Sequence, residues 1–184
     1  MVTPFNTGYD RDAKPTVLFV DDEPNILRSL RRELIDSGFN IHVRTSASEA
    51  FPVLRSGKIS VVVTDLCMPD MDGIEFLEKI NQINPAIVRI ILTGHADLVS
   101  AMEVVNRCQL FRLLIKPWDR QELLMTLRTA VSHHRLMKEH ERLFKENAQN
   151  QELLTDLEKK YPGITTLPPQ DQEGAYILDE NLGE

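Results

Sequence analysis

The sequence predicts an α/β fold in which a parallel sheet carries helices on both faces, a doubly wound arrangement. Short apolar runs alternate five times with amphipathic segments over about 120 residues. The runs expected to form strands are 16–20, 40–44, 61–65, 88–93 and 110–115. Most of them are continuously apolar and rich in Val and Ile, which is typical of strands buried on both faces in a parallel sheet.

Start and stop signals predict a helix after each strand. Pro24 suits the first turn of a helix, and a Gly such as Gly38 commonly follows the last turn. Ser46 with Glu49 and Asp119 with Glu122 have the spacing of capping boxes. The expected helices run from Pro24 to a stop at Gly38, from Ser46 to Arg55, from Ile74 to a stop before Pro85, from Leu98 to Arg107, and from Arg120 to about Lys160.

The pattern divides the chain into four parts. Residues 1–14 are polar and are interpreted as a flexible leader, and residues 15–133 form the compact α/β domain. No Pro or Gly interrupts the last helix until Pro162-Gly163, so residues 134–161 are interpreted as a helical extension. The acidic, Pro-containing remainder, 162–184, is expected to be mostly disordered.

The extension has the spacing of a coiled coil. Positions three and four residues apart form one seam: Leu136, His140, Leu143, Asn147, Asn150, Leu154, Leu157 and Tyr161. Asn147 falls at an a position, where Asn favours a two-stranded parallel coil, so we expect a homodimer through this helix. Because three of the eight positions are polar, a solvated helical tail remains the alternative. His133, His134 and His140 are expected to be solvated.

Bulk composition excludes some function classes. A formal charge of -7 argues against a free-standing nucleic-acid binder. Cys67 and Cys108 have no metal-type spacing and are expected to be small buried residues in a reducing compartment. No secretory signal and no membrane-length apolar run are found. We therefore expect a cytoplasmic protein without a membrane partner.

Polar residues capable of chemistry follow four of the expected strands. They are Asp21 with Asp22, then Asp65, Thr93 and Lys116. The carboxyl ends of parallel strands lie at one edge of the sheet, where ligands bind in open α/β folds. Clustered carboxylates repel unless a cation intervenes, and Mg²⁺ prefers oxygen ligands. With a lysine and a hydroxyl nearby, these groups favour phosphoryl transfer to an aspartate.

The four motifs together resemble the receiver domain of two-component response regulators. They are Asp21-Asp22-Glu-Pro, the stretch from Asp65-Leu-Cys-Met-Pro to Asp72-Gly73, Thr93-Gly94, and Lys116-Pro117-Trp118. The resemblance covers about residues 15–133, and the chain resembles the chemotaxis-regulator-like, single-domain type with a C-terminal coiled-coil extension. It implies a flavodoxin-like, five-stranded parallel sheet with strand order 2-1-3-4-5.

The resemblance also implies roles for the site residues. Asp65 would accept a phosphoryl group from a sensor histidine kinase. Asp22 and Asp65 would hold Mg²⁺ together with the backbone carbonyl of Cys67, and Asp21 would contribute through water. Thr93 and Lys116 would bind the phosphoryl group.

The sequence departs from the family pattern at the switch positions. Leu113 stands where many receivers carry an aromatic residue, and alternation along the strand places Phe111 on the same side, so either residue is a candidate for that role. Cys67 and His95 lie two residues past the aspartate and the threonine, at positions that tune hydrolysis in the family. For His95 an exposed loop histidine is an equal alternative.

The leading hypothesis is a phosphorylation-switched signalling protein that uses its long helix as output toward an unknown protein target. The first alternative is a coiled-coil scaffold or adaptor regulated by the receiver. The second is a phosphohydrolase that forms an aspartyl-phosphate. Such enzymes typically carry an acid two residues after the nucleophile, and Cys67 occupies that position.

Overall fold

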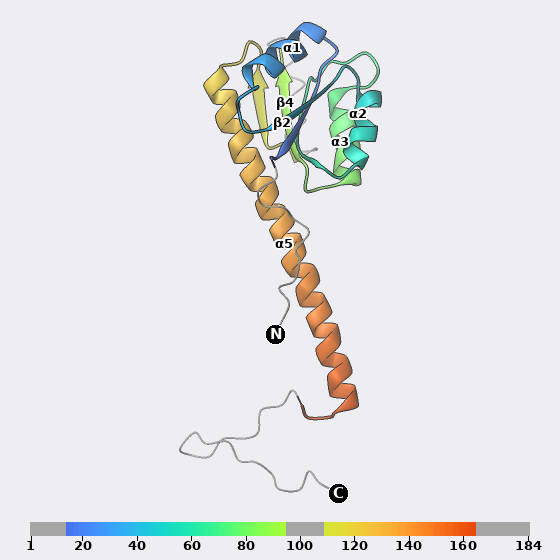
Figure 1. The fold of residues 1–184 in the computed structure, drawn as a ribbon. Helices are drawn as coiled ribbons and strands as arrows, with labels where there is room; N and C mark the ends of the chain where they lie inside the picture. The colour runs from blue at the N-terminus through green and yellow to red at the C-terminus, as the bar shows by residue number, and fades with distance from the viewer. Residues whose placement is uncertain (1–13, 95–108, 165–184) are drawn as a thin grey trace, which may run out of the picture. The chain divides into compact units, whose positions relative to one another are not determined.

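The predicted parallel sheet is confirmed in the computed structural model, which describes residues 14–94 and 109–164. Five strands pair in the order β2-β1-β3-β4-β5, all parallel. Their bounds are β1 Thr16–Val20, β2 Asn40–Arg44, β3 Ile59–Thr64, β4 Val88–Thr93 and β5 Arg112–Ile115. Because all five strands run the same way, their carboxyl ends form one edge (Figure 1).

Four helices lie among the described residues, and three of them connect strands. They are α1 Pro24–Glu33, α2 Ala47–Arg55, α3 Gly73–Ile83 and α5 Arg120–Lys160. The helix expected at 98–107 lies outside the described residues. Ser46 caps α2 as expected, since its Oγ accepts a hydrogen bond from Glu49 N, while Glu49 Oε2 accepts one from Thr45 N, the residue before the cap. Local side-chain signals therefore located this helix start correctly.

Helix α1 ends earlier than its expected stop at Gly38. Its last residue is Glu33, and the Ser37 hydroxyl donates to the Leu34 carbonyl at 2.6 Å. This side-chain bond satisfies a carbonyl that a further helical turn would otherwise use. Gly38 then takes a φ of 84°, which explains why a glycine occupies that position.

Strand alternation divides the core into two layers, one on each face of the sheet. Leu18, Val62 and Ile91 pack with buried residues of α2 and α3. Phe19, Val63 and their neighbours pack with α1 and the first part of α5. Figure 1 shows α2 and α3 on one side of the sheet and α1 with α5 on the other. Both faces are thus covered, as a doubly wound fold requires.

Helix α5 is buried only over its first part. Its buried residues are Leu123, Thr126, Leu127, Ala130, Val131 and His134. His134 was expected to be solvated, but it is only 5% exposed and its Nδ1 lies 2.7 Å from the Ala86 carbonyl oxygen. Burial lowers the pKa of this imidazole and outweighs the carbonyl contact, which raises it. The packed part of α5 therefore reaches at least to His134.

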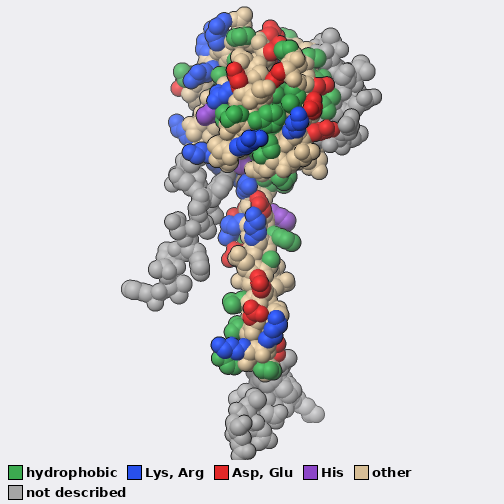
Figure 2. Space-filling view, turned by 90° about the vertical axis from the view of Figure 1, so that its right-hand side faces the viewer, with side chains coloured by type: hydrophobic (Ala, Val, Ile, Leu, Met, Phe, Trp, Pro, Cys, Tyr) green, Lys and Arg blue, Asp and Glu red, His purple; other side chains and the backbone are tan. Residues whose placement is uncertain are grey.

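The described residues from Glu139 onward belong to a second unit of the chain. The helix continues to Lys160, and intrahelical ion pairs line it, including Arg142 with Glu139 and Glu146, and Lys145 with Glu141. Figure 2 shows hydrophobic side chains on its surface among acidic and basic ones. In the described part of the chain, no helix is apolar over a length that would cross a bilayer.

The turn between β3 and α3 depends on Gly73. Its backbone N donates to the Leu66 carbonyl at 2.8 Å. A β-carbon on residue 73 would lie 2.2 Å from the Asp65 carbonyl oxygen and 2.9 Å from Leu66 Cα. Both are backbone atoms, which cannot swing away as a flexible side chain would. Close approach of α3 to the end of β3 therefore requires glycine here.

We predict that Gly73→Ala destabilises the fold by about 1–3 kcal/mol or more, because the added methyl must displace backbone. Urea unfolding measures the loss. The matched control is Gln82→Ala, an exposed position of the same helix, which should stay within about 0.5 kcal/mol of the parent. Equal stability of the Gly73→Ala variant and the parent would contradict the close approach.

Candidate functional site

Three strand ends converge on one lysine. Lys116 follows β5, and its backbone N donates to the Thr93 carbonyl at the end of β4. Its Nζ lies 2.6 Å from Asp21 Oδ2 and 2.8 Å from Asp65 Oδ2. The lysine side chain is 14% exposed, and those of the two aspartates are 3% and 10% exposed. The predicted gathering of Asp21, Asp65 and Lys116 is therefore present in the structure.

The Asp65 carboxylate is held by contacts to both of its oxygens. Oδ1 accepts a hydrogen bond from Leu66 N at 2.6 Å, and Oδ2 accepts one from Lys116 Nζ. The backbone N of Asp65 donates to the Val20 carbonyl, which ties the end of β3 to β1. Charge-assisted bonds of this kind fix orientation as well as adding energy. Asp65 thus presents a carboxylate in a defined position at the sheet edge.

Asp21 carries an electrostatic cost. Its Oδ1 accepts a hydrogen bond from Glu23 N, while Oδ2 lies at ion-pair distance from Lys116 without an aligned hydrogen bond. Burial raises the pKa of the Asp21 carboxyl, and the nearby ammonium only partly offsets that rise. For Lys116, burial lowers the pKa, but the neighbouring carboxylates of Asp21 and Asp65 outweigh it and the net pKa is raised. The charged form of Lys116 is therefore favoured, whereas burial disfavours the ionised form of Asp21.

The acidic cluster fits a hard divalent cation. Carboxylate oxygens of Asp21, Asp22 and Asp65 all lie within 4.8 Å of one another. Asp21 and Asp65 are buried, whereas Asp22 is exposed. An all-oxygen set open to water on one side suits Mg²⁺, which keeps several waters. A cation would also relieve the cost of ionising Asp21, so the residues present fit the metal.

Thr93 contributes a buried hydroxyl that lacks a partner. The residue is fully buried at the end of β4, and among the described residues no group hydrogen-bonds its Oγ1. A buried hydroxyl without a partner costs about 1–3 kcal/mol. Such a group at the edge that holds Asp65 and Lys116 is available to hydrogen-bond a ligand oxygen.

Leu113 and Phe111, the two candidates for the switch position, do not share one side of the sheet. Leu113 packs against the cluster under α2 and α3, while Phe111 packs against the opposite cluster. The alternation argument was wrong because β5 begins at Arg112, so Phe111 lies before the regular strand. Its ring instead faces His133, with centroids 5.4 Å apart. Phe111 therefore does not substitute for an aromatic residue at position 113.

Of the two positions expected to tune hydrolysis, Cys67 and His95, the structure describes only Cys67. Cys67 was expected to be buried but is exposed, because it lies in the turn after β3 beyond the buried Asp65 and Leu66. Its proposed metal ligand is the backbone carbonyl, which the side chain's exposure does not affect. His95 and Cys108 lie outside the described residues.

Sequence reasoning missed three contributors to the site. Glu23 Oε1 lies 3.9 Å from Lys116 Nζ, and Glu23 N holds Asp21. Leu66 N orients Asp65, and Gly73 allows α3 to approach it. Of these, only Gly73 had a readable signal, a glycine directly after a helix-capping Asp72.

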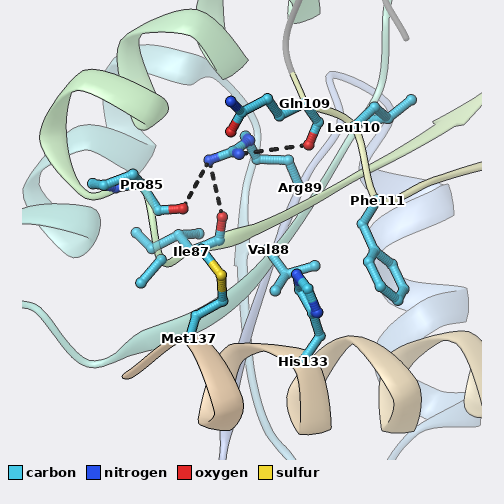
Figure 3. A pocket seen from close by; sticks show the side chains of 10 residues that line it. Pro85, Ile87, Val88, Arg89, Gln109, Leu110, Phe111, His133 and Met137 are labelled. Atoms are coloured by element: carbon cyan, nitrogen blue, oxygen red, sulfur yellow. Dashed lines mark hydrogen bonds between the residues drawn. The ribbon is translucent and has the colours of Figure 1, made fainter. Parts of the chain in front are cut away.

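A hollow of about 400 Å³ lies at the opposite edge of the sheet, where β4 starts (Figure 3). Arg89 is buried beside it, and His133 reaches into it from α5. The guanidinium donates to three backbone carbonyls, those of Pro85, Ile87 and Gln109. Asp21, Asp22 and Asp65 do not line this hollow, so it is separate from the acidic cluster.

The family model for the response regulator receiver domain matches residues 17–128. The chain belongs to the response regulator receiver domain family. This receiver is similar to the hydrogenase transcriptional regulatory protein HoxA of Cupriavidus necator, with 36% identity over 132 residues, 72% of this chain and 27% of the relative. It is also similar to the DNA-binding transcriptional regulator NtrC of Proteus hauseri, with 32% identity over 126 residues, 68% of this chain and 26% of the relative.

Solved structures with the same fold include one described as a receiver domain. A signal receiver domain of an HD domain-containing protein from Pseudomonas fluorescens matches at 36% identity and a TM-score of 0.65, covering 68% of this chain and 93% of that one. A structure described as adenylate cyclase from Rhodopirellula baltica matches at 33% identity and a TM-score of 0.67, covering 72% and 98%. The chain spans about a quarter of the length of the two curated relatives above.

We predict that Asp21→Asn stabilises the receiver at pH 7 when divalent cations are chelated. Because the folded-state pKa of Asp21 is raised above its ordinary 3.8, the folded state binds this proton more tightly than the unfolded one. The stability contributed by the protonated carboxyl is full below pH 3.8 and is lost as pH rises through the raised pKa. The Asp21→Asn side chain cannot ionise, so the variant does not lose this stability as pH rises.

Urea midpoints of the parent and the variant at several pH values measure the effect. The midpoints should converge at low pH and separate in favour of the variant as pH rises. Asp22→Asn is the control, because this exposed carboxylate loses little hydration on folding and should give a smaller gain. A lower midpoint for Asp21→Asn at pH 7 would mean that the Lys116 ion pair outweighs the burial cost.

Proposed function

We propose that this receiver is a two-component response regulator whose Asp65 accepts a phosphoryl group from a sensor histidine kinase in a Mg²⁺-dependent reaction. The observation that carries the proposal is the Asp65 carboxylate itself, held by Leu66 N and Lys116 Nζ beside two further acids. A carboxylate so positioned, with an ammonium in contact, is suited to attack phosphorus.

In the proposed reaction an Asp65 oxygen forms a bond to the phosphorus of a phosphohistidine. The P–N bond breaks, and its electron pair stays with the imidazole, which takes up a proton as it leaves. Lys116 neutralises negative charge on the phosphoryl oxygens, and the Thr93 hydroxyl, buried without a partner among the described residues, donates to one of them. Asp22, Asp65 and the Cys67 carbonyl would hold Mg²⁺, with Asp21 contributing through water, and the metal would supply further charge neutralisation when bound.

Only self-catalysed phosphorylation and dephosphorylation are proposed, without turnover of an external substrate. Cys67 occupies the position where a phosphohydrolase of this type would need an acid.

The output is proposed to run through α5. This helix begins four residues after Lys116, so a change in the lysine's contacts acts on the segment that leads into it. Exposed apolar positions beyond His134, such as Leu143 and Leu154, favour association with a second copy or a partner helix. The curated relatives are transcriptional regulators by name, but we propose a cytoplasmic protein target here, without direct nucleic-acid contact.

In the scaffold alternative, association through the exposed leucines of α5 would be constitutive. Phosphorylation of the receiver would only adjust it. The two readings differ in whether association depends on the phosphodonor.

We predict that a small phosphodonor such as acetyl phosphate, with Mg²⁺, adds one phosphoryl group to the chain and that Asp65→Asn abolishes the addition. Intact-mass spectrometry measures the mass gain, and omission of Mg²⁺ should suppress it. Asp70→Asn is the matched control, since Asp70 is an exposed acid of the same loop whose carboxylate bonds Ser48, and it should be labelled like the parent. Labelling that survives in Asp65→Asn would refute the site.

We also predict that the chain forms a dimer whose fraction changes with the phosphodonor. Light scattering gives the mass across a concentration series, with Asp65→Asn as the unphosphorylated control. A dimer fraction that responds in the parent only would support a switched output. A dimer with no response would favour the scaffold reading, and a monomer throughout would exclude the homodimer.

A further inference from the structure

The exposed part of α5 carries two apolar groups separated by a polar stretch. The large exposed apolar residues beyond His134 are Leu136, Met137, Leu143, Phe144, Leu153, Leu154, Tyr161 and Ile164. Between the two groups, residues 145–152 are polar except for Ala148. Helical bonding continues past Lys160, since Tyr161 N donates to the Leu157 carbonyl at 2.8 Å. The two groups therefore lie on one continuous helix with a polar centre.

In a parallel pair each seam residue would lie opposite the same residue of the partner helix. His140 would meet His140, Asn147 would meet Asn147, and Asn150 would meet Asn150. Asn147 alone tolerates this arrangement well, because an a-position Asn pairs with its counterpart. In this arrangement, however, three of the eight seam layers contain only polar side chains, and two imidazoles face each other.

An antiparallel pair matches the seam better. Aligning Leu143 with the partner's Leu154 places Leu136 opposite the partner's Tyr161 and His140 opposite the partner's Leu157. The polar centre is then self-complementary, because Asn147 meets the partner's Asn150 on both sides of the twofold axis. Amide side chains can both donate and accept, so two adjacent layers satisfy each other. Every other layer contains at least one large apolar side chain.

Charge complementarity also favours the antiparallel arrangement. Glu139 and Lys160 flank the seam at equivalent g positions, and the antiparallel alignment brings Glu139 beside the partner's Lys160 at both ends. Within its own helix Glu139 forms an ion pair with Arg142 at 2.8 Å. In the antiparallel pair its carboxylate would therefore lie between Arg142 and the partner's Lys160. In the parallel alignment Glu139 would instead lie beside the partner's Phe144, without an opposite charge.

We propose that α5 pairs with a second copy of this chain in antiparallel orientation, with Leu143 of one helix against Leu154 of the other. This rests on the homodimer of the proposed function and specifies its orientation and register. The amino ends of the two paired helical segments then lie at opposite ends of the pair. Asn147 alone predicts a parallel pair. The antiparallel pair is proposed instead because the eight seam layers taken together favour it.

Disulfide crosslinking tests the orientation directly. Cys67 and Cys108 are replaced by Ser, and Leu143→Cys and Leu154→Cys are made as separate full-length chains, one of them enlarged by a fused tag. The two are mixed under reducing conditions, allowed to exchange, and oxidised. The antiparallel pair predicts a crosslinked product of mixed size in the mixture, at least about tenfold more abundant than the like-with-like product of either variant alone.

Each outcome has one meaning, provided that sedimentation of the reduced mixture is measured in parallel. Like-with-like crosslinks from each variant alone would overturn the proposal in favour of a parallel coil, while the homodimer stands. A dimeric sample without crosslinks in any arm would overturn the register. If the cysteine-free parent is a monomer at all concentrations, the homodimer itself fails and the orientation with it.

Discussion

The contact of Lys116 with Asp21 and Asp65 is the interaction on which the sheet edge depends. Two carboxylates that are nearly buried would repel each other and lose hydration, and the single ammonium 2.6 and 2.8 Å away makes their proximity tolerable. Removing the ammonium from such a buried cluster typically costs about 3–5 kcal/mol, since uncompensated carboxylates are left behind. The ends of β1, β3 and β5 are therefore joined electrostatically as well as through the sheet.

The same lysine couples the site to β4 and α5. Its backbone N is bonded to the Thr93 carbonyl, while the Thr93 hydroxyl has no partner among the described residues. A group that binds between Asp65 and Lys116 would compete for the ammonium and offer an acceptor to the hydroxyl. In the proposed function both changes would act on the segment that enters α5 at Arg120. Ligand binding and helix position would then be linked through a short covalent path rather than through the whole core.

The elements and the strand-end residues could be predicted from the sequence because both follow from local pattern and parallel topology. Asp21, Asp65 and Lys116 meet because their strands run in the same direction. Details that depend on where an element begins could not be predicted. Phe111 was assigned to the wrong face since β5 starts at Arg112, two residues later than expected. His134 looked like a solvated residue of an exposed helix, and only the tertiary position of Ala86 makes it a buried one.

Helix α5 changes its source of stability along its length. Up to His134 it is held by burial against the sheet. Beyond that point its side chains form ion pairs on the exposed surface of the helix, which contribute little because water and salt screen them. Full burial of one leucine is worth about 1.5–3 kcal/mol, so covering Leu143 and Leu154 would outweigh those pairs. In the proposed pair the stability of this part of the helix would be tied to association, and a shift in its packed first part would change the geometry that association requires.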